Sequence, residues 1–215
     1  MNDATPMDKN LAGAALIKRG RKFDQVLDGA RTVFLADGYE GASVDAIARA
    51  AGVSKATLYS YFPDKRLLFM EVAKAECCGQ IDETEAFIAD GVPVREGLRD
   101  AATRMVDLVL SEFGQAVFRM CVAESERFPE LGREFFENGP AVFKRQLCAF
   151  LRAAEDRGEV VVPDVELAAD QFVELCHAHL FVEHVFGIRT ASSAADKARV
   201  IEGAIDTFMA RYGAA

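Results

Sequence analysis

The sequence contains no apolar run that approaches the length needed to span a bilayer. No basic start followed by an uninterrupted apolar stretch and a small-residue cleavage site occurs near Met1, so we expect no signal peptide. The five cysteines are an odd number and include the neighbours Cys77 and Cys78, which does not suggest a disulfide framework. The absence of tryptophan decides nothing. These features favour a cytoplasmic protein with reduced thiols and no membrane partner.

Signatures of catalysis are also missing. The chain has no phosphate-binding loop, no nucleophile paired with a base and no pair of carboxylates at a motif-like spacing. His177 and His184 are seven residues apart and share a helix face, whereas His179 points elsewhere. We expect no metal there, because no carboxylate or cysteine lies nearby at ligand spacing, and no cofactor. A histidine that lines a pocket or a dimer interface is the favoured interpretation.

The charge of the chain is unevenly distributed. Its 215 residues are 51% hydrophobic and 27% charged, with a net charge of −9. Residues 1–75 carry 11 Lys and Arg against 9 Asp and Glu, whereas residues 76–215 carry 14 against 25. The segment 9–22 holds five basic residues and no acidic one. The acidity therefore belongs to the C-terminal part, and the asymmetry indicates two functions in one chain.

Helical periodicity extends along almost the whole sequence and predicts an all-α fold. The only β-branched run, DRGEVVVP at 156–163, is too short and isolated to build a sheet. After a flexible basic arm at 1–21, a first helix begins at Lys22 and ends at the glycines of ADGYEG. The further helices are expected at 43–50, 54–61, 64–80, 94–112, 115–126, 130–156, 164–187 and 194–212.

The stretch AGVSKATLYSYFPDKRLLF at 51–69 has the pattern of a helix-turn-helix. Ser43 can cap the first of its helices and Ser54 the second, while Gly52 suits the tight turn between them. Apolar residues on both helices can pack on the helix that precedes them. Pro63 and Asp64 then open the next helix, since proline is tolerated in a first turn.

One side of helix 54–61 remains polar, and a helix of this kind fits the major groove of DNA. Lys55 supplies charge, hydroxyl groups donate to phosphate oxygens, and the amide-rich start of a helix favours an anion. Lys65, in the first turn of the next helix, is placed for a phosphate of the neighbouring strand. The residues at or near the outer side are Ser54, Lys55, Thr57, Tyr59, Ser60 and Tyr61.

The segment FLADGYEGASVDAIARAAGVSKATLYSYFPDKRLLFMEV resembles the DNA-binding region of the TetR family of transcriptional regulators, over residues 24 to 72. The resemblance implies that Ser43, Ser54, Lys55, Thr57, Tyr59, Tyr61 and Lys65 face DNA. It puts Ala56 where the family often has glycine and the backbone comes close to DNA, and Ser60 where many members have a bulkier polar residue. As alternatives, Ser54 is partly explained as a helix cap, and Tyr61 could merely pack against the first helix.

The segment FRMCVAESERFPELGREFFENGPAVFKRQLCAFLRAAEDRGEV resembles the C-terminal domain of AefR-like and multidrug-efflux-repressor members of that family. The resemblance implies an inducer pocket between the central helices. Most of the many phenylalanines must form the core of the bundle, and some can line a cavity for an apolar molecule. The candidate ligand-binding residues are Met105, Phe113, Phe118, Cys121, Phe143, Leu147, Phe172 and Cys176.

The same resemblance implies that the last two helices pair with a second subunit as a four-helix bundle. Helix 194–212 has an apolar stripe suited to such an interface. A homodimer is also what two half-sites one helical turn apart require. The candidate interface residues are His184, Val200, Ile201, Ala204, Ile205 and Phe208.

The sequence therefore predicts a DNA-binding domain at 22–72, a ligand-binding and dimerisation domain at 73–215, and a connector in helix 64–80. The leading hypothesis is a repressor that a small hydrophobic ligand releases from a palindromic operator. The alternatives are a DNA-binding regulator without a small inducer and a helical enzyme.

Overall fold

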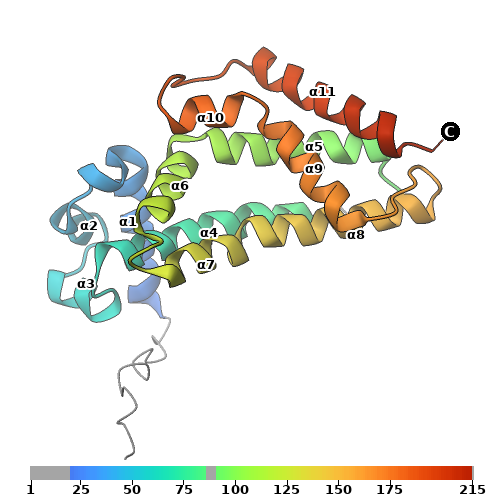
Figure 1. The fold of residues 1–215 in the computed structure, drawn as a ribbon. Coiled ribbons are helices and arrows are strands. Elements are labelled where there is room, and N and C mark those ends of the chain that lie inside the picture. The colour runs from blue at the N-terminus through green and yellow to red at the C-terminus, as the bar shows by residue number, and fades with distance from the viewer. Residues whose placement is uncertain (1–19, 86–90, 215) are drawn as a thin grey trace, which may run out of the picture. The chain divides into compact units, whose positions relative to one another are not determined.

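The computed structural model describes residues 20–85 and 91–214, including their side chains except for 76–85. Within these ranges the chain forms helices and no β-strand, apart from an isolated bridge between Val160 and Gly213 (Figure 1). The all-α fold class is confirmed. The chain divides into two compact units, Met1–Leu68 and Phe69–Ala215, and the division falls within helix α4 (Lys65–Glu85). No described helix is both long and apolar enough to cross a membrane.

The first unit contains three helices before the start of α4. These are α1 (Arg21–Gly41), α2 (Val44–Ala50) and α3 (Lys55–Tyr61). Helix α1 buries Phe23, Val26 and Phe34, which lie at helical spacing. Gly38 interrupts its helical dihedrals with a φ of 68°, a conformation that glycine adopts without steric cost. The basic arm predicted for 1–21 lies outside the described residues except for its last two.

The second unit is a helical bundle. It consists of the rest of α4 followed by α5 (Val94–Leu110), α6 (Glu112–Glu124), α7 (Pro129–Asn138), α8 (Pro140–Asp156), α9 (Val165–His177), α10 (Leu180–Val185) and α11 (Ala194–Tyr212). Helix α11 packs on α5 and α9, and α8 packs on α7 and α9 (Figure 1). The core lies between α5, α8, α9 and α11, where Leu98, Leu151, Phe172 and Ile205 are fully buried.

Two helices predicted as continuous are each broken in the structure. The segment 130–156 divides at Gly139, which has a non-helical ψ of −92°. Gly139 precedes Pro140, and proline disfavours helical geometry in the residue before it. The segment 164–187 divides at Ala178 and His179, and His179 has a left-handed φ of 47°. Both predictions of a single helix were therefore wrong.

Close packing and ion pairs fix α11 to α5. Helix α5 also packs closely on α8, because a Cβ on Gly97 would lie 2.0 Å from the ring of Phe150. On the flanks, Arg95 pairs with Asp206 at 2.9 Å. A second pair joins Arg99 to Glu202, and a third joins Asp107 to Lys197 at 2.6 Å. The apolar face of α11 is consequently held against the chain's own core.

Candidate functional site

The helix-turn-helix is built by local hydrogen bonds that the sequence predicts. The Ser43 hydroxyl accepts from the backbone N–H of Ala46 at 3.1 Å and caps α2. The Ser54 hydroxyl accepts from the N–H of Thr57 at 3.1 Å and caps α3. Between the helices, Gly52 has a φ of 64°. The two caps and the glycine therefore set the angle between α2 and α3.

Apolar contacts hold α3 on the rest of the first unit. Its Leu58 and the following Phe62 are 1% and 2% exposed, and Phe62 packs on Phe23 with ring centroids 5.3 Å apart. Helix α1 approaches the turn so closely that a Cβ on Gly29 would lie 2.5 Å from the backbone nitrogen of Ala51. Helix α3 is thus a fixed element that needs no ligand to hold it in place.

The outward face of α3 is polar and accessible. Lys55, Ala56, Tyr59 and Ser60 are exposed, and Tyr59 is 48% exposed although it is a large aromatic residue. The Thr57 side chain is half-buried. A rigid helix that presents a lysine, hydroxyl groups and an exposed tyrosine has the chemistry for phosphate and base contacts.

Several of these polar groups have partners within the unit. The ammonium of Lys55 lies 2.6 Å from a carboxylate oxygen of Asp45 on α2. The Ser60 hydroxyl donates to the Thr57 carbonyl at 2.6 Å, and the Ser54 and Thr57 hydroxyls lie 2.8 Å apart. A DNA phosphate at Lys55 would therefore have to share or displace Asp45.

Two of the predicted DNA-contacting residues, Tyr61 and Lys65, make tertiary contacts within the first unit. The Tyr61 ring packs edge-on against Phe23, with centroids 5.9 Å apart, as the alternative for this residue proposed. The Lys65 ammonium donates to the carbonyls of Tyr39 at 2.8 Å and Ala42 at 3.1 Å, and it lies 4.4 Å from the centre of the Tyr39 ring. These contacts account for Lys65 without DNA, and its phosphate contact stays a prediction.

The structure separates the predicted ligand-binding residues of the second unit into two groups. Four are buried in the core that includes α11: Met105, Leu147, Phe172 and Cys176. Of the other four, Phe143 is half-buried and packs against this core. Phe113 and Phe118 are half-buried outside it, and Cys121 is buried with its thiol 3.7 Å from the Met70 sulfur. Met105, Leu147, Phe172 and Cys176 are core residues in this structure. For Phe172 this agrees with the interpretation that most phenylalanines form the core of the bundle.

A small cavity of about 10 Å³ lies between α4 and α7. Its lining consists of Met70, Ala73, Lys74, Glu134, Phe135, Asn138 and Gly139, and includes none of the eight predicted ligand residues. The lysine and glutamate were not singled out from the sequence, because a helical pattern does not reveal which polar residue faces a cavity. This cavity combines apolar walls with two opposite charges.

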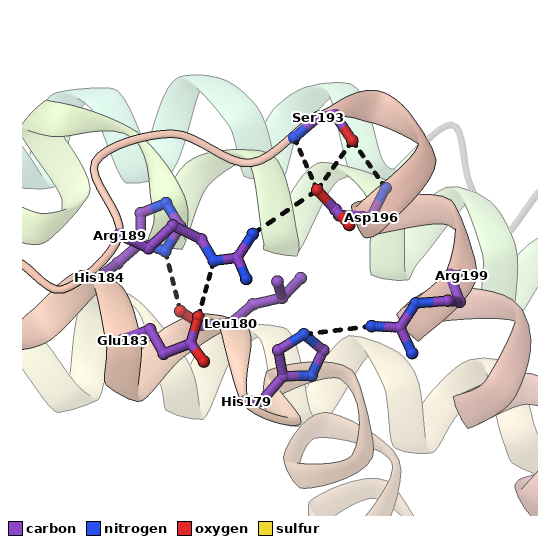
Figure 2. A network of polar contacts seen from close by, with 8 residues as sticks. All are labelled: His179, Leu180, Glu183, His184, Arg189, Ser193, Asp196 and Arg199. Carbon is purple, nitrogen blue, oxygen red and sulfur yellow. Dashed lines mark hydrogen bonds and ion pairs between the residues drawn. The ribbon is translucent and has the colours of Figure 1, made fainter.

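The residues of the predicted dimer interface are buried within the single chain. The apolar stripe on helix 194–212 is 0–7% exposed in the single chain, because most of it faces the core of the second unit. His184 is 6% exposed, and its Nδ1 lies 2.9 Å from the Leu180 carbonyl (Figure 2). A dimer contact through His184, Val200, Ile201, Ala204, Ile205 and Phe208 stays a prediction.

Exposed apolar residues lie instead on α10 and the loop after it. Val182, Phe186 and Ile188 are 56%, 75% and 76% exposed. The loop is ordered because Arg189 bridges Glu183, at 2.7 Å, and Asp196 at the start of α11, at 3.6 Å (Figure 2). The sequence signal for this patch is weak, since two of its three residues lie inside the segment 164–187 predicted as one continuous helix.

Burial governs the protonation of one histidine and one cysteine of this unit. Among the described residues, no group of three or more His, Cys, Asp and Glu is arranged to hold a metal ion. Burial lowers the pKa of His177 below its ordinary 6.5 and outweighs the opposing effect of Glu174. Burial also raises the pKa of the Cys176 thiol to about 12, which keeps this thiol protonated and unreactive.

Comparison with known proteins gives two matching family models. One, described as "AefR-like transcriptional repressor, C-terminal domain", matches residues 96–214. The other, described as "Bacterial regulatory proteins, tetR family", matches residues 26–72. These models cover both predicted domains and confirm the resemblance stated from the sequence.

Solved structures extend the similarity over most of the chain. A TetR-family transcriptional regulator from Mesorhizobium loti is 28% identical with a TM-score of 0.80, and the match covers 90% of this chain and 97% of that one. The flavonoid-responsive regulator FrrA is 35% identical with a TM-score of 0.66, and the match covers 91% and 98% of the two chains.

Among curated relatives, the negative transcriptional regulator IcaR of the biofilm operon of Staphylococcus aureus is 36% identical over 55 residues. That match spans 26% of this chain and only 28% of IcaR. The relatives are transcriptional regulators, which argues against the alternative of a helical enzyme.

Proposed function

Since the chain belongs to the TetR family of bacterial transcriptional regulators, we propose that it represses transcription by binding a palindromic operator as a homodimer. The observation that carries the proposal is the polar outward face of α3 on an apolar inner face that fixes its position. In a dimer, two such helices occupy successive major grooves on one side of the duplex. A protein with this function acts in the cytoplasm, where the DNA is.

We assign different roles to the residues of α3. Tyr59 and Ala56 lie exposed and contact bases or the sugar–phosphate backbone, since their side chains are not needed to hold the unit together. Lys55 binds a phosphate in exchange for Asp45. Ser43 and Ser54 cap helices whose first backbone N–H groups face the phosphates, and Thr57 and Ser60 add hydroxyls.

The second copy of the chain packs against the apolar patch formed by Val182, Phe186 and Ile188. Large side chains with more than half of their surface in water favour burial against an apolar partner. The ion pairs of Arg189 with Glu183 and Asp196 hold the patch in one conformation, so little conformational entropy is lost on association. The dimer interface thus lies on α10 and its following loop rather than on the buried stripe of α11.

A small hydrophobic ligand bound in the second unit releases the operator. The ligand must bind the DNA-incompetent arrangement more tightly than the competent one, because a ligand with equal affinity for both shifts nothing. Support comes from FrrA, which is described as flavonoid-responsive, and from the apolar walls of the cavity at α4 and α7. Helix α4 carries the signal, since it is one continuous helix with residues in both units.

The alternative is a regulator without a small inducer. The small volume of the cavity favours it, since a drug-sized ligand needs a few hundred Å³ and its entry must move side chains. The two functions differ in one result, which is whether any small molecule weakens operator binding.

The DNA-binding proposal is tested with the duplex that the purified chain selects from a random-sequence library. Tyr59→Ala should weaken binding to this duplex by roughly tenfold or more, as expected for the loss of a base or backbone contact. Its matched control is Phe136→Ala, which truncates an aromatic residue that is 58% exposed on α7, in the other unit. An unchanged affinity of Tyr59→Ala would remove Tyr59 from the interface, and failure to select any sequence would overturn the proposed function.

A further inference from the structure

Aromatic side chains from four helices form a connected cluster in the second unit. Phe118 of α6 contacts Phe135 of α7 with ring centroids 6.4 Å apart, and Phe181 of α10 with centroids 5.0 Å apart, both edge-on. The imidazole of His177, the last residue of α9, stacks on Phe181 at 4.9 Å with an interplanar angle of 23°. The cluster thus brings one imidazole into a group of phenyl rings.

His177 carries a polar atom that has no partner. Its Nε2 is buried and makes no hydrogen bond among the described residues. Its Nδ1 lies 3.9 Å from a carboxylate oxygen of Glu174, which is too long for a hydrogen bond. A buried polar atom without a hydrogen bond is costly, so this nitrogen calls for an explanation.

Burial keeps the imidazole neutral, because it lowers the pKa of His177 and outweighs the carboxylate of Glu174. A neutral imidazole has one N–H donor and one acceptor nitrogen. Whichever of these Nε2 is, a hydroxyl group complements it, since a hydroxyl both donates and accepts.

The break between α9 and α10 produces this arrangement. The Leu180 N–H donates to the Ala178 carbonyl at 2.7 Å, and His179 between them adopts its left-handed conformation. The guanidinium of Arg199 on α11 lies 3.2 Å from the Nε2 of His179 (Figure 2). Because a guanidinium only donates hydrogen bonds, the Nε2 of His179 is the acceptor in this pair. Across this turn the ring of Phe181 stacks on the imidazole of His177.

The cluster adjoins the cavity at α4 and α7 through Phe135, which belongs to both. A molecule in the cavity therefore touches the ring of Phe135, which in turn contacts the ring of Phe118. The ring centroids of the cluster lie 5.0 and 6.4 Å apart, which is the spacing of aromatic pairs. A flat aromatic molecule suits this site, because it can make the same kind of contact with each ring that the rings now make with one another.

We propose, building on the function proposed above, that the cluster of Phe118, Phe135, His177 and Phe181 binds the effector, and that the effector is a hydroxylated aromatic molecule. Its rings stack among the phenylalanines, and its hydroxyl group hydrogen-bonds to the Nε2 of His177. His177 is the residue that selects phenolic compounds over unsubstituted aromatic ones.

The test compares a panel of monohydroxyflavones with unsubstituted flavone by isothermal titration calorimetry on the full chain. At least one monohydroxyflavone should bind the wild type roughly five- to tenfold more tightly than flavone, the effect of one buried hydrogen bond. His177→Phe keeps an aromatic ring and removes both nitrogens, so it should bind flavone as before and lose this preference. His179→Asn is the matched control, since asparagine also tolerates the left-handed conformation, and it should keep the preference.

A measurement on the wild type guards against misfolding of the variant. The chain has three histidines, so the ¹⁵N resonance of the His177 Nε2 can be assigned and followed by NMR. It should move on addition of the preferred monohydroxyflavone and stay in place with flavone. The proposal would be overturned if the wild type bound none of these compounds or preferred none of them. It would also be overturned if the preference survived in His177→Phe, or if the resonance did not move. Operator binding by the same preparation tells this failure from failure of the DNA-binding function.

Discussion

Single residues in this chain are held by partners that are distant in sequence, and Lys65 is the clearest case. The caps made by Ser43 and Ser54 follow from a local pattern and could be predicted. The carbonyls that hold Lys65 lie 26 and 23 residues away, so no local pattern reveals them. The same holds for the burial of His177, whose predicted interpretation left both a pocket and an interface open.

The lowered pKa of His177 predicts a pH dependence of stability. The unfolded chain binds a proton at this residue near its ordinary value of 6.5, whereas the folded chain binds it only at lower pH. Stability is therefore fully present above pH 6.5 and is lost as the pH falls through the folded pKa. Between about pH 7.5 and pH 5.5, the urea midpoint of the wild type should fall more steeply than that of His177→Phe. Parallel curves from circular dichroism would contradict the burial of a neutral imidazole.

At the scale of elements, the start of α11 rests on a capping box. The Ser193 hydroxyl accepts from the Asp196 N–H at 3.1 Å, and the Asp196 carboxylate reaches back to the Ser193 N–H. Ser193→Ala should lower the free energy of unfolding by about 1 kcal/mol, measured by urea denaturation. The neighbouring Ser192 supplies the control, because its hydroxyl is buried without a partner among the described residues. Ser192→Ala should be neutral or stabilising, and equal losses in the two variants would count against the cap.

Helix existence was predictable, but helix continuity and the facing of α11 were not. Periodicity identifies 130–156 and 164–187 as helical, yet single residues at Gly139 and His179 break them. The stripe on α11 is apolar whether it meets the chain's own core or a second subunit. Only tertiary packing on α5 and α9 decides between the two, and it left the exposed apolar surface on α10 instead.

At the scale of the whole molecule, the uneven charge suits a dimer that binds DNA with one part only. Residues 76–215 hold 25 of the 34 acidic residues, and such a surface repels the phosphate backbone. The first unit alone carries the polar helix α3 that meets DNA in the proposed function. A symmetric pair of chains would then place two copies of α3 on one face of the duplex.

The most direct test is hydroxyl-radical footprinting on the selected duplex, combined with sedimentation velocity of the free protein. The wild type should sediment as a dimer and protect two symmetric segments about one helical turn apart. Phe186→Glu places a charge in the proposed interface, so it should sediment as a monomer and lose the paired footprint. Phe136→Glu, at an exposed phenylalanine on α7, should behave like the wild type. A wild type that stays monomeric, or that protects a single segment or none, would contradict the account.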